Sequence, residues 1–269
     1  MHASRSTRSS PPWLSLSLLF VLFFALPLVG LVWRASTDGD VAEALTATRT
    51  VEALRLSLFT ATLTTALAVV LGTPLAYLLA TRESAASRLL ATLLELPLVL
   101  PPAVAGIALL TAFGRAGILG DPLEAAGVSL SFTTAAVVMA QLFVAAPYYL
   151  RAAYGGFAST DPRYEAVAAT LGLSPWRVFR DVALPLARPA LVGGLILCWA
   201  RALGELGATL LFAGSLPGRT QTMPLAIISA FESSDGLAGA VSIAVVLLAF
   251  AAVLLVALNW LARARGPYG

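Results

Sequence analysis

The sequence predicts an all-α polytopic membrane protein with six transmembrane helices. Of its 269 residues, 59% are hydrophobic and only 12% are charged, whereas a soluble domain carries about 25% charged residues. This much apolar surface requires membrane lipid as its solvent. The apolar residues also fall into separate stretches, each as long as the ~20 residues that a membrane-spanning helix needs.

The apolar stretches cover approximately residues 13–33, 54–80, 89–112, 132–155, 190–212 and 237–262. The first follows Arg5 and Arg8, as the apolar part of a signal peptide would. Its apolar run exceeds the ~7–15 residues of a signal peptide, and no small-residue cleavage site precedes Arg34. We therefore expect an uncleaved first span and one six-helix domain over residues 13–262, between short termini at 1–12 and 263–269.

Arginine placement predicts which loops face the cytoplasm. All 17 basic residues are arginine, and with the N-terminus inside, most of them fall in cytoplasmic segments, as is general in membrane proteins. Both termini are therefore expected in the cytoplasm of a multi-pass protein of the cell membrane. The net charge of +3 follows from this topology and requires no nucleic-acid partner. The arginines expected in outer loops are Arg34, Arg49, Arg115 and Arg219.

The residue inventory excludes several kinds of site. Without lysine the chain cannot form a Walker A phosphate loop. Its single histidine, His2, and single cysteine, Cys198, cannot build a His/Cys metal cluster or an intrachain disulfide. The same shortage, together with the absence of paired carboxylates, argues against an integral-membrane enzyme. Cys198 lies in the fifth stretch, where we expect it to serve packing.

One long cytoplasmic loop, residues 159–189, carries the signals of two short helices. Asp161 is a helix N-cap followed by Pro162 at the first helical position. Gly172 then provides a C-terminal stop. A second start signal follows, and we expect the second helix to end before Pro185.

These two helices present a surface suited to a soluble partner. Glu165, Ala168 and Gly172 fall on one face of the first helix, where small residues let another surface approach closely. Trp176 in the second helix lies among arginines, a composition typical of interface hot spots. An amphipathic hairpin on the inner leaflet has the same composition. On these residues alone both interpretations stay open.

The third stretch contains Pro97, Pro101 and Pro102, each of which removes a backbone donor and bends or breaks a helix. Freed carbonyls at membrane depth are tolerated only against protein or a water-filled cavity. We interpret this stretch as a bent helix that lines the translocation pathway near a gate. The alternative is a kink that improves packing. Glu95, at the inner start of this stretch, is expected at the membrane interface.

The fifth stretch contains Arg201 and Glu205, four residues apart on one helical face. An unpaired arginine at the centre of a spanning helix costs roughly 2.5–3.5 kcal/mol, so the two side chains are expected to neutralise one another. Gly207 nearby permits close helix approach. This face either lines or gates the route of an anion, or the pair holds two helices together.

The outer loop, residues 213–236, contains Arg219, Thr220 and Gln221. These side chains suit contact with a polar partner. One arginine with hydroxyls does not amount to an anion site with several convergent donors.

The pattern Glu165-x-x-Ala168-x-x-x-Gly172, followed by Leu184 and Pro185, resembles the EAA loop of ABC-importer permeases. The commonest form of that motif has its Glu at the position of Ala166, which leaves open which residue makes the charged contact. Three further segments resemble signatures of the molybdate-type branch of the family: residues 96–106, 201–209 and 217–227. The resemblance covers nearly the whole chain.

This resemblance implies a type I ABC importer permease (MetI-like) fold and the translocation of molybdate or tungstate into the cell. In that family the loop is a coupling helix seated in a cleft of an ATP-hydrolysing subunit. The residues implied for this contact are Glu165, Ala168, Gly172, Trp176, Leu184 and Pro185. A second copy of the chain, two ATPase subunits and an extracytoplasmic oxyanion-binding protein are the implied partners. ATP-Mg would bind to the ATPase, so this chain is expected to be no enzyme and to hold no cofactor.

Two other functions are weighed against this one. A sulfate or thiosulfate permease is the alternative within the family, because tetrahedral dianions differ too little in size for a membrane-subunit motif to separate them. An ion-coupled secondary transporter would predict inverted repeats and mid-membrane carboxylates. We expect one carboxylate, Glu205, to be buried within a span, and it is already paired with Arg201.

Overall fold

The computed structural model describes residues 12–82 and 84–264, and every regular element in this part of the chain is helical. Residues 1–11 and 265–269 fall outside it, and with them most of the two termini expected in the cytoplasm. His2, Arg5, Arg8 and Arg265 therefore lie outside the described residues.

Within the described residues, five helices are long and apolar enough to cross a membrane, and a bent pair makes a sixth candidate. The five are α1 (Pro12–Thr37), α3 (Thr48–Thr81), α7 (Thr134–Ala158), the helix that runs from α9 (Pro175–Val178) to the end of α10 (Leu184–Leu203), and α13 (Gly236–Ala264). The bent pair joins α4 (Ala85–Glu95), through the short helix η1 (Leu96–Leu98), to α5 (Pro102–Phe113) at an angle of 113°. The six predicted stretches thus each overlap a helical span when the bent pair is counted as one. The fifth stretch, 190–212, was misplaced, because its helix begins at Pro175 within the predicted loop and ends at Leu203.

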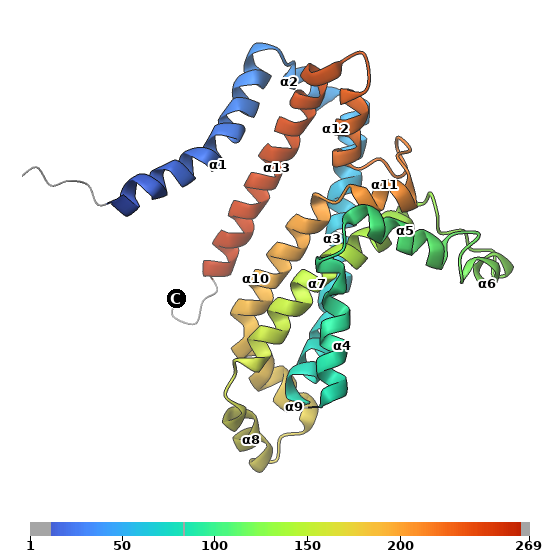
Figure 1. The fold of residues 1–269 in the computed structure, drawn as a ribbon. Helices are drawn as coiled ribbons and strands as arrows, with labels where there is room; N and C mark the ends of the chain where they lie inside the picture. Colours follow the sequence, from blue (N-terminus) through green and yellow to red (C-terminus); the bar gives the residue numbers. More distant parts are fainter. Residues whose placement is uncertain (1–11, 83, 265–269) are drawn as a thin grey trace, which may run out of the picture.

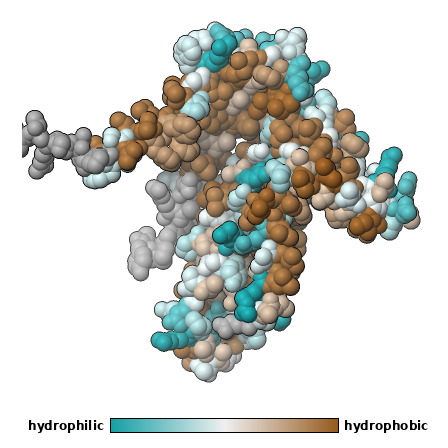
Figure 2. All heavy atoms as spheres, in the orientation of Figure 1, coloured by the Kyte–Doolittle hydropathy of each residue, from teal (hydrophilic) through white to brown (hydrophobic). Residues whose placement is uncertain are grey.

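Short helices connect the spans at the two ends of the molecule. One end carries α8 (Pro162–Thr170), and the opposite end carries α2 (Val41–Thr46) and α12 (Met223–Phe231). Helices α6 (Gly120–Ala125) and α11 (Gly207–Ala213) lie between these ends in Figure 1, and α6 projects to one side. Figure 1 shows α8 far from α2, α6 and α12. In Figure 2, hydrophilic residues gather at these ends, while hydrophobic residues cover much of the surface between them.

Helices α3, α7 and α10 form the centre of the protein, where small residues allow close packing. A Cβ atom on Gly156 of α7 would lie 2.6 Å from the Cβ of Ala190 in α10, and one on Gly194 would lie 2.7 Å from the Cβ of Ala152. Small residues at such crossings let membrane helices approach closely. Cys198 is fully buried in this core, which confirms the expected packing role.

The prediction that Pro185 ends the second loop helix is wrong. The helix continues from α9 through a π-helical turn, η2 (Phe179–Ala183), into α10. The N–H of Leu184 donates to the carbonyl of Phe179, five residues earlier. This wider turn places Pro185 in the first turn of a new α-helical segment, where its missing N–H is tolerated.

Candidate functional site

Helix α8 has the ends that the sequence predicts. At its N-terminus the Asp161 carboxylate accepts a hydrogen bond of 2.9 Å from the N–H of Arg163, and Pro162 follows it. At its C-terminus the N–H of Gly172 donates to Ala169 and that of Leu173 donates to Ala168, which is the Schellman pattern. Both ends of this short helix are therefore satisfied by local bonds.

The backbone conformation at position 172 favours glycine. Its φ of +84° lies in the left-handed region that other residues rarely adopt, and a Cβ placed there would meet no atom of the chain within 4 Å. The sequence pattern also placed Gly172, as a small residue, on the face that a partner approaches. Within the chain, its role is to end α8 and turn toward α9.

Glu165 and Ala168 face the chain's own membrane helices. The Tyr77 hydroxyl of α3 donates a 2.7 Å hydrogen bond to Oε2 of Glu165, and Ala168 is buried. The Tyr77 ring lies 4.9 Å from the ring of Phe179, measured between centroids. This corrects the interpretation that the small-residue face is turned toward a partner, because the intramolecular neighbours already occupy it.

The exposed face of α8 is apolar instead. Tyr164, Val167 and Leu171 follow one another at three and four positions, so their side chains share one side of the helix. Leu171 is 75% exposed, and Trp176 beyond the glycine turn is 65% exposed. We call these four residues the α8 face. The sequence reasoning named only Trp176, although the spacing of the other three could have indicated them.

Leu184 and Pro185, the last residues of the predicted loop contact, belong to α10. Leu184 packs partly against the central core, and Pro185 is exposed at the surface. Because the helix from Pro175 is continuous, both residues are mechanically joined to the loop.

The predicted bend in the third span is confirmed. Pro97 lies in η1, Pro101 caps the N-terminus of α5, and Pro102 is its first residue. In each of these positions the missing N–H needs no helical acceptor. The chain therefore changes direction by 113° between the two helices while the prolines remain unstrained.

The fifth span is also broken, which the sequence interpretation did not foresee. Helix α10 ends at Leu203 and α11 begins at Gly207, so Arg201 and Glu205 do not share one continuous helix. Nη2 of Arg201 lies 2.6 Å from Oε2 of Glu205. Oε1 of Glu205 accepts a 2.9 Å hydrogen bond from the N–H of Ala208, in the first turn of α11. One carboxylate thus fastens the end of one helix to the start of the next.

The two broken spans meet in space. A Cβ on Gly207 would lie 2.8 Å from the Cβ of Pro102, and one on Gly106 would lie 2.9 Å from the Cβ of Leu211. Helices α5 and α11 therefore pack closely beside the prolines of the bend, an arrangement that only glycine allows at these positions. The structure brings together Pro102 and Gly207, two residues that the sequence singled out separately.

The burial of the ion pair differs between its partners. The side chain of Glu205 is 1% exposed, whereas that of Arg201 is 24% exposed. Both oxygens of the carboxylate contact groups of this chain, so Glu205 serves the local structure. Arg201 retains a partly open surface.

Glu95 lies at the C-terminal end of α4, not at the beginning of the span where it was placed. Its Oε2 is 4.0 Å from Nη1 of Arg151 in α7, and both side chains are more than one-third exposed. Such a pair contributes about 0–1 kcal/mol. It connects α4 to α7 loosely.

Of the three outer-loop residues predicted to face a partner, only Arg219 is exposed. Thr220 is fully buried, and its hydroxyl accepts from the N–H of Leu216. The Gln221 amide donates to the hydroxyls of Ser215 and Ser229. These two residues shape the loop from inside and hold Arg219 at its surface.

Known proteins resemble this chain over most of its length. Residues 68–266 match the family described as binding-protein-dependent transport system inner membrane component. The molybdenum transport system permease protein ModB of Mycobacterium tuberculosis is 45% identical over 245 residues, which cover 91% of this chain and 92% of that protein. The molybdate/tungstate transport system permease protein WtpB of Thermococcus kodakarensis is 33% identical, covering 92% of this chain and 93% of its own length.

A solved structure shares the fold. A chain of a bacterial alginate ABC transporter, solved in complex with an alginate pentasaccharide-bound periplasmic protein, superposes with a TM-score of 0.74. The match covers 96% of this chain and 94% of that one at 15% sequence identity. At this identity the similarity establishes the architecture alone.

Proposed function

This chain belongs to the family of binding-protein-dependent transport system inner membrane components, and we propose that it is the permease subunit of an ABC importer for molybdate or tungstate. The observation that carries the substrate is the 45% identity, over 91% of the chain, with a molybdenum permease. The all-helical, multi-pass fold is that of type I (MetI-like) importer permeases. The chain is thus a membrane transport subunit.

We place the α8 end of the molecule in the cytoplasm. Arginines are concentrated in the segments that end or begin the spans on that side, and cytoplasmic loops carry such an excess. The members within the described residues are Arg82, Arg88, Arg151, Arg163, Arg177, Arg180, Arg188 and Arg263. The opposite end, with α2 and α12, then faces outward, where an oxyanion-binding protein would dock.

The α8 face is the proposed docking surface for the ATPase. Aliphatic and aromatic side chains exposed to water at a loop, as Leu171 and Trp176 are, indicate a protein contact. The capped ends of α8 hold these side chains in a fixed arrangement, which reduces the entropy lost on binding. Two ATPase subunits would bind two copies of this chain, with the translocation pathway between the copies.

The loop is connected to the spans in two ways that suit the transmission of movement. Tyr77 joins α3 to α8 through its hydrogen bond to Glu165. The unbroken helix from Pro175 to Leu203 carries a displacement of the loop directly into α10. When ATP closes the ATPase pair, α8 would move with it, and α3 and α10 would follow.

The far end of α10 reaches the proposed gate. There the Arg201–Glu205 pair links α10 to α11, which packs against α5 at the proline bend. A shift of α10 would therefore alter the contact between the two broken spans. Arg201, which is still partly open, is the residue of this group suited to meet a passing anion.

Uptake by the reconstituted complex tests the proposal. Proteoliposomes that contain this chain, its ATPase and ATP should accumulate radiolabelled molybdate when the binding protein is added outside. Unlabelled tungstate should compete fully, and sulfate at the same concentration should not. Full competition by sulfate alone would reassign the chain to the sulfate branch and leave its architecture unchanged.

A further inference from the structure

A cleft with two arginines in its largely apolar lining lies near α6, and neither Arg201 nor Glu205 lines it. Its volume is about 770 Å³, and the residues that line it come from the end of α5, the segment before α7 and the loop before α12. Arg115 and Arg219 both line it, together with Ser129 and Ser131. Sequence reasoning saw only Arg219 here, because Arg115 lies in a different outer loop.

The cleft is built by contacts that fix its two walls to each other. The Thr134 hydroxyl donates a 2.9 Å hydrogen bond to the carbonyl of Arg219. Phe132 has a φ of +61°, the only positive value at a non-glycine residue in the described part of the chain. Its ring packs against Gly214, where a Cβ would lie 3.0 Å from the ring. Backbone strain of this kind persists where the surrounding structure requires it, and it is common at ligand sites.

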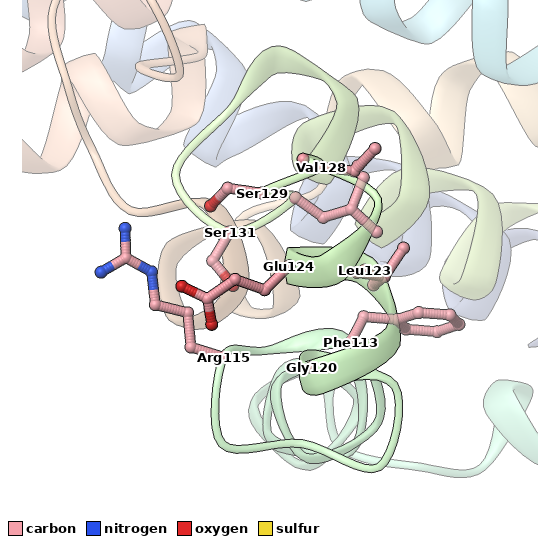
Figure 3. Close-up of a pocket in the computed structure, with 10 residues that line it drawn as sticks. Phe113, Arg115, Gly120, Leu123, Glu124, Val128, Ser129 and Ser131 are labelled. Carbon is pink, nitrogen blue, oxygen red and sulfur yellow. The ribbon is translucent and has the colours of Figure 1, made fainter.

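Neither Arg115 nor Arg219 forms an ion pair among the described residues. The hydroxyl of Ser131 is buried and has no hydrogen-bond partner there. A buried polar atom without a partner is costly and calls for an explanation such as a ligand. Figure 3 draws the pocket that adjoins the cleft, and in it the guanidinium of Arg115 and the hydroxyl of Ser129 lie on the same side, away from Phe113, Leu123 and Val128.

One acidic side chain adjoins these donors. Glu124 of α6 lines the pocket next to the cleft, which also includes Arg115 and Ser131, and its carboxylate points toward the same side as Arg115 in Figure 3. It forms no ion pair with Arg115 within the described residues. The negative charge of Glu124 opposes the binding of an anion by these donors.

We propose that this cleft binds a small tetrahedral oxyanion, of the molybdate and tungstate type, on the outer side of the permease before it enters the pathway. Two guanidinium groups match the two negative charges of such an anion, and each presents several N–H donors to its oxygens. The serine hydroxyls add neutral donors. This inference rests on the proposed function for the identity of the anion, and it gives the permease a binding step of its own after the binding protein releases its cargo.

Tungstate binding to the permease–ATPase complex in nanodiscs, without binding protein, tests this site. Isothermal titration should show binding that Arg115→Gln and Arg219→Gln each weaken about fivefold, and that the double variant weakens roughly twentyfold. Glu124→Gln should strengthen it, a change that loss of folding cannot mimic. Arg49→Gln is the matched control, since Arg49 is an exposed outer arginine that lines a different cleft, and it should leave the affinity unchanged.

Three results would overturn the site. The wild-type complex could fail to bind tungstate, or the double variant could bind it as tightly as wild type. Alternatively, the variants could leave tungstate binding intact and raise only the concentration of binding protein needed for uptake, which would make the cleft a protein contact. In each case normal molybdate uptake by the wild-type system would leave the proposed function standing, whereas absent uptake would refute that function separately.

Discussion

Two regions of this permease are built in different ways. At the α8 end a short helix has both termini capped by local hydrogen bonds, and the apolar α8 face is exposed among charged side chains. Beside α6 the cleft is bordered by irregular backbone with a strained Phe132, and Arg115 and Arg219 are exposed there together with apolar side chains. Apolar burial suits a lasting subunit contact, whereas exposed charge suits rapid, reversible encounter with an anion or a binding protein. The comparison indicates that one fold can present an apolar surface suited to a permanent partner and, elsewhere, a charged cleft suited to transient ones.

The largest expected effect comes from a charge placed in the α8 face. Leu171→Asp should abolish stable association with the ATPase, because a desolvated carboxylate in an apolar contact costs several kcal/mol, on the order of an interface hot spot. Co-purification and size-exclusion chromatography measure the association. Ile118→Asp is the control, since Ile118 is an equally exposed aliphatic residue just before α6. Equal loss in both variants would mean that general instability, and not docking, is responsible.

The next largest effect is expected at the helix junction. Glu205→Gln leaves Arg201 without its counter-charge and should lower the free energy of unfolding by about 2–3 kcal/mol, somewhat less than for a fully buried pair, since Arg201 remains 24% exposed. Thermal unfolding in detergent measures this change, and the uptake assay measures transport. The double variant Arg201→Gln with Glu205→Gln should recover much of the stability. Normal assembly and transport in Glu205→Gln would contradict any role for the pair at the gate.

Two substitutions of Gly172 test whether glycine is needed there for its backbone conformation or for the space that it leaves for the partner. Gly172→Val should distort the end of α8 at a cost of about 1–2 kcal/mol, and should raise the ATP hydrolysed per molybdate imported. Gly172→Asn tolerates the left-handed conformation and should keep coupling close to wild type. If Gly172→Asn uncouples ATP hydrolysis from transport as strongly as Gly172→Val, glycine is needed at this position because the ATPase leaves no space for a side chain, and not because of the φ of +84°.

The smallest expected effect is at the link between the loop and α3. Tyr77→Phe removes the hydrogen bond to Glu165 and keeps the aromatic packing, so it should cost about 1 kcal/mol. The ATPase should still bind, while transport at saturating ATP falls a few-fold. A normal rate would show that α10 alone transmits the movement. Tyr154→Phe, on the neighbouring span α7, serves as the control because its hydroxyl has no hydrogen bond within the described residues.

Sequence patterns sufficed for features that depend on neighbouring residues. Apolar runs located the spans, Asp161 with Pro162 located the start of α8, and Gly172 located its end. The direction of Glu165 could not be predicted, because its partner Tyr77 lies 88 residues earlier. The continuation of the helix past Pro185 depends on a π-turn that no residue pattern announces.

In the candidate sites, too, features set by neighbouring residues were predicted, and features set by residues far apart in the sequence were not. The proline bend was predicted, since each proline acts on its own backbone. Its contact with Gly207 was not predicted, because that contact joins two spans. The outer cleft was missed for the same reason: Arg115 and Arg219 belong to separate loops that the fold brings to one cavity.

The most direct measurement of the central claim is ATP-driven molybdate uptake by proteoliposomes that contain this chain, its ATPase and the binding protein, compared between wild type and Leu171→Asp. We expect uptake by the wild-type complex only, with the variant inserted in the membrane yet unable to bind the ATPase. Equal uptake by both would contradict docking through the α8 face, and uptake by neither would contradict the assignment to a molybdate importer.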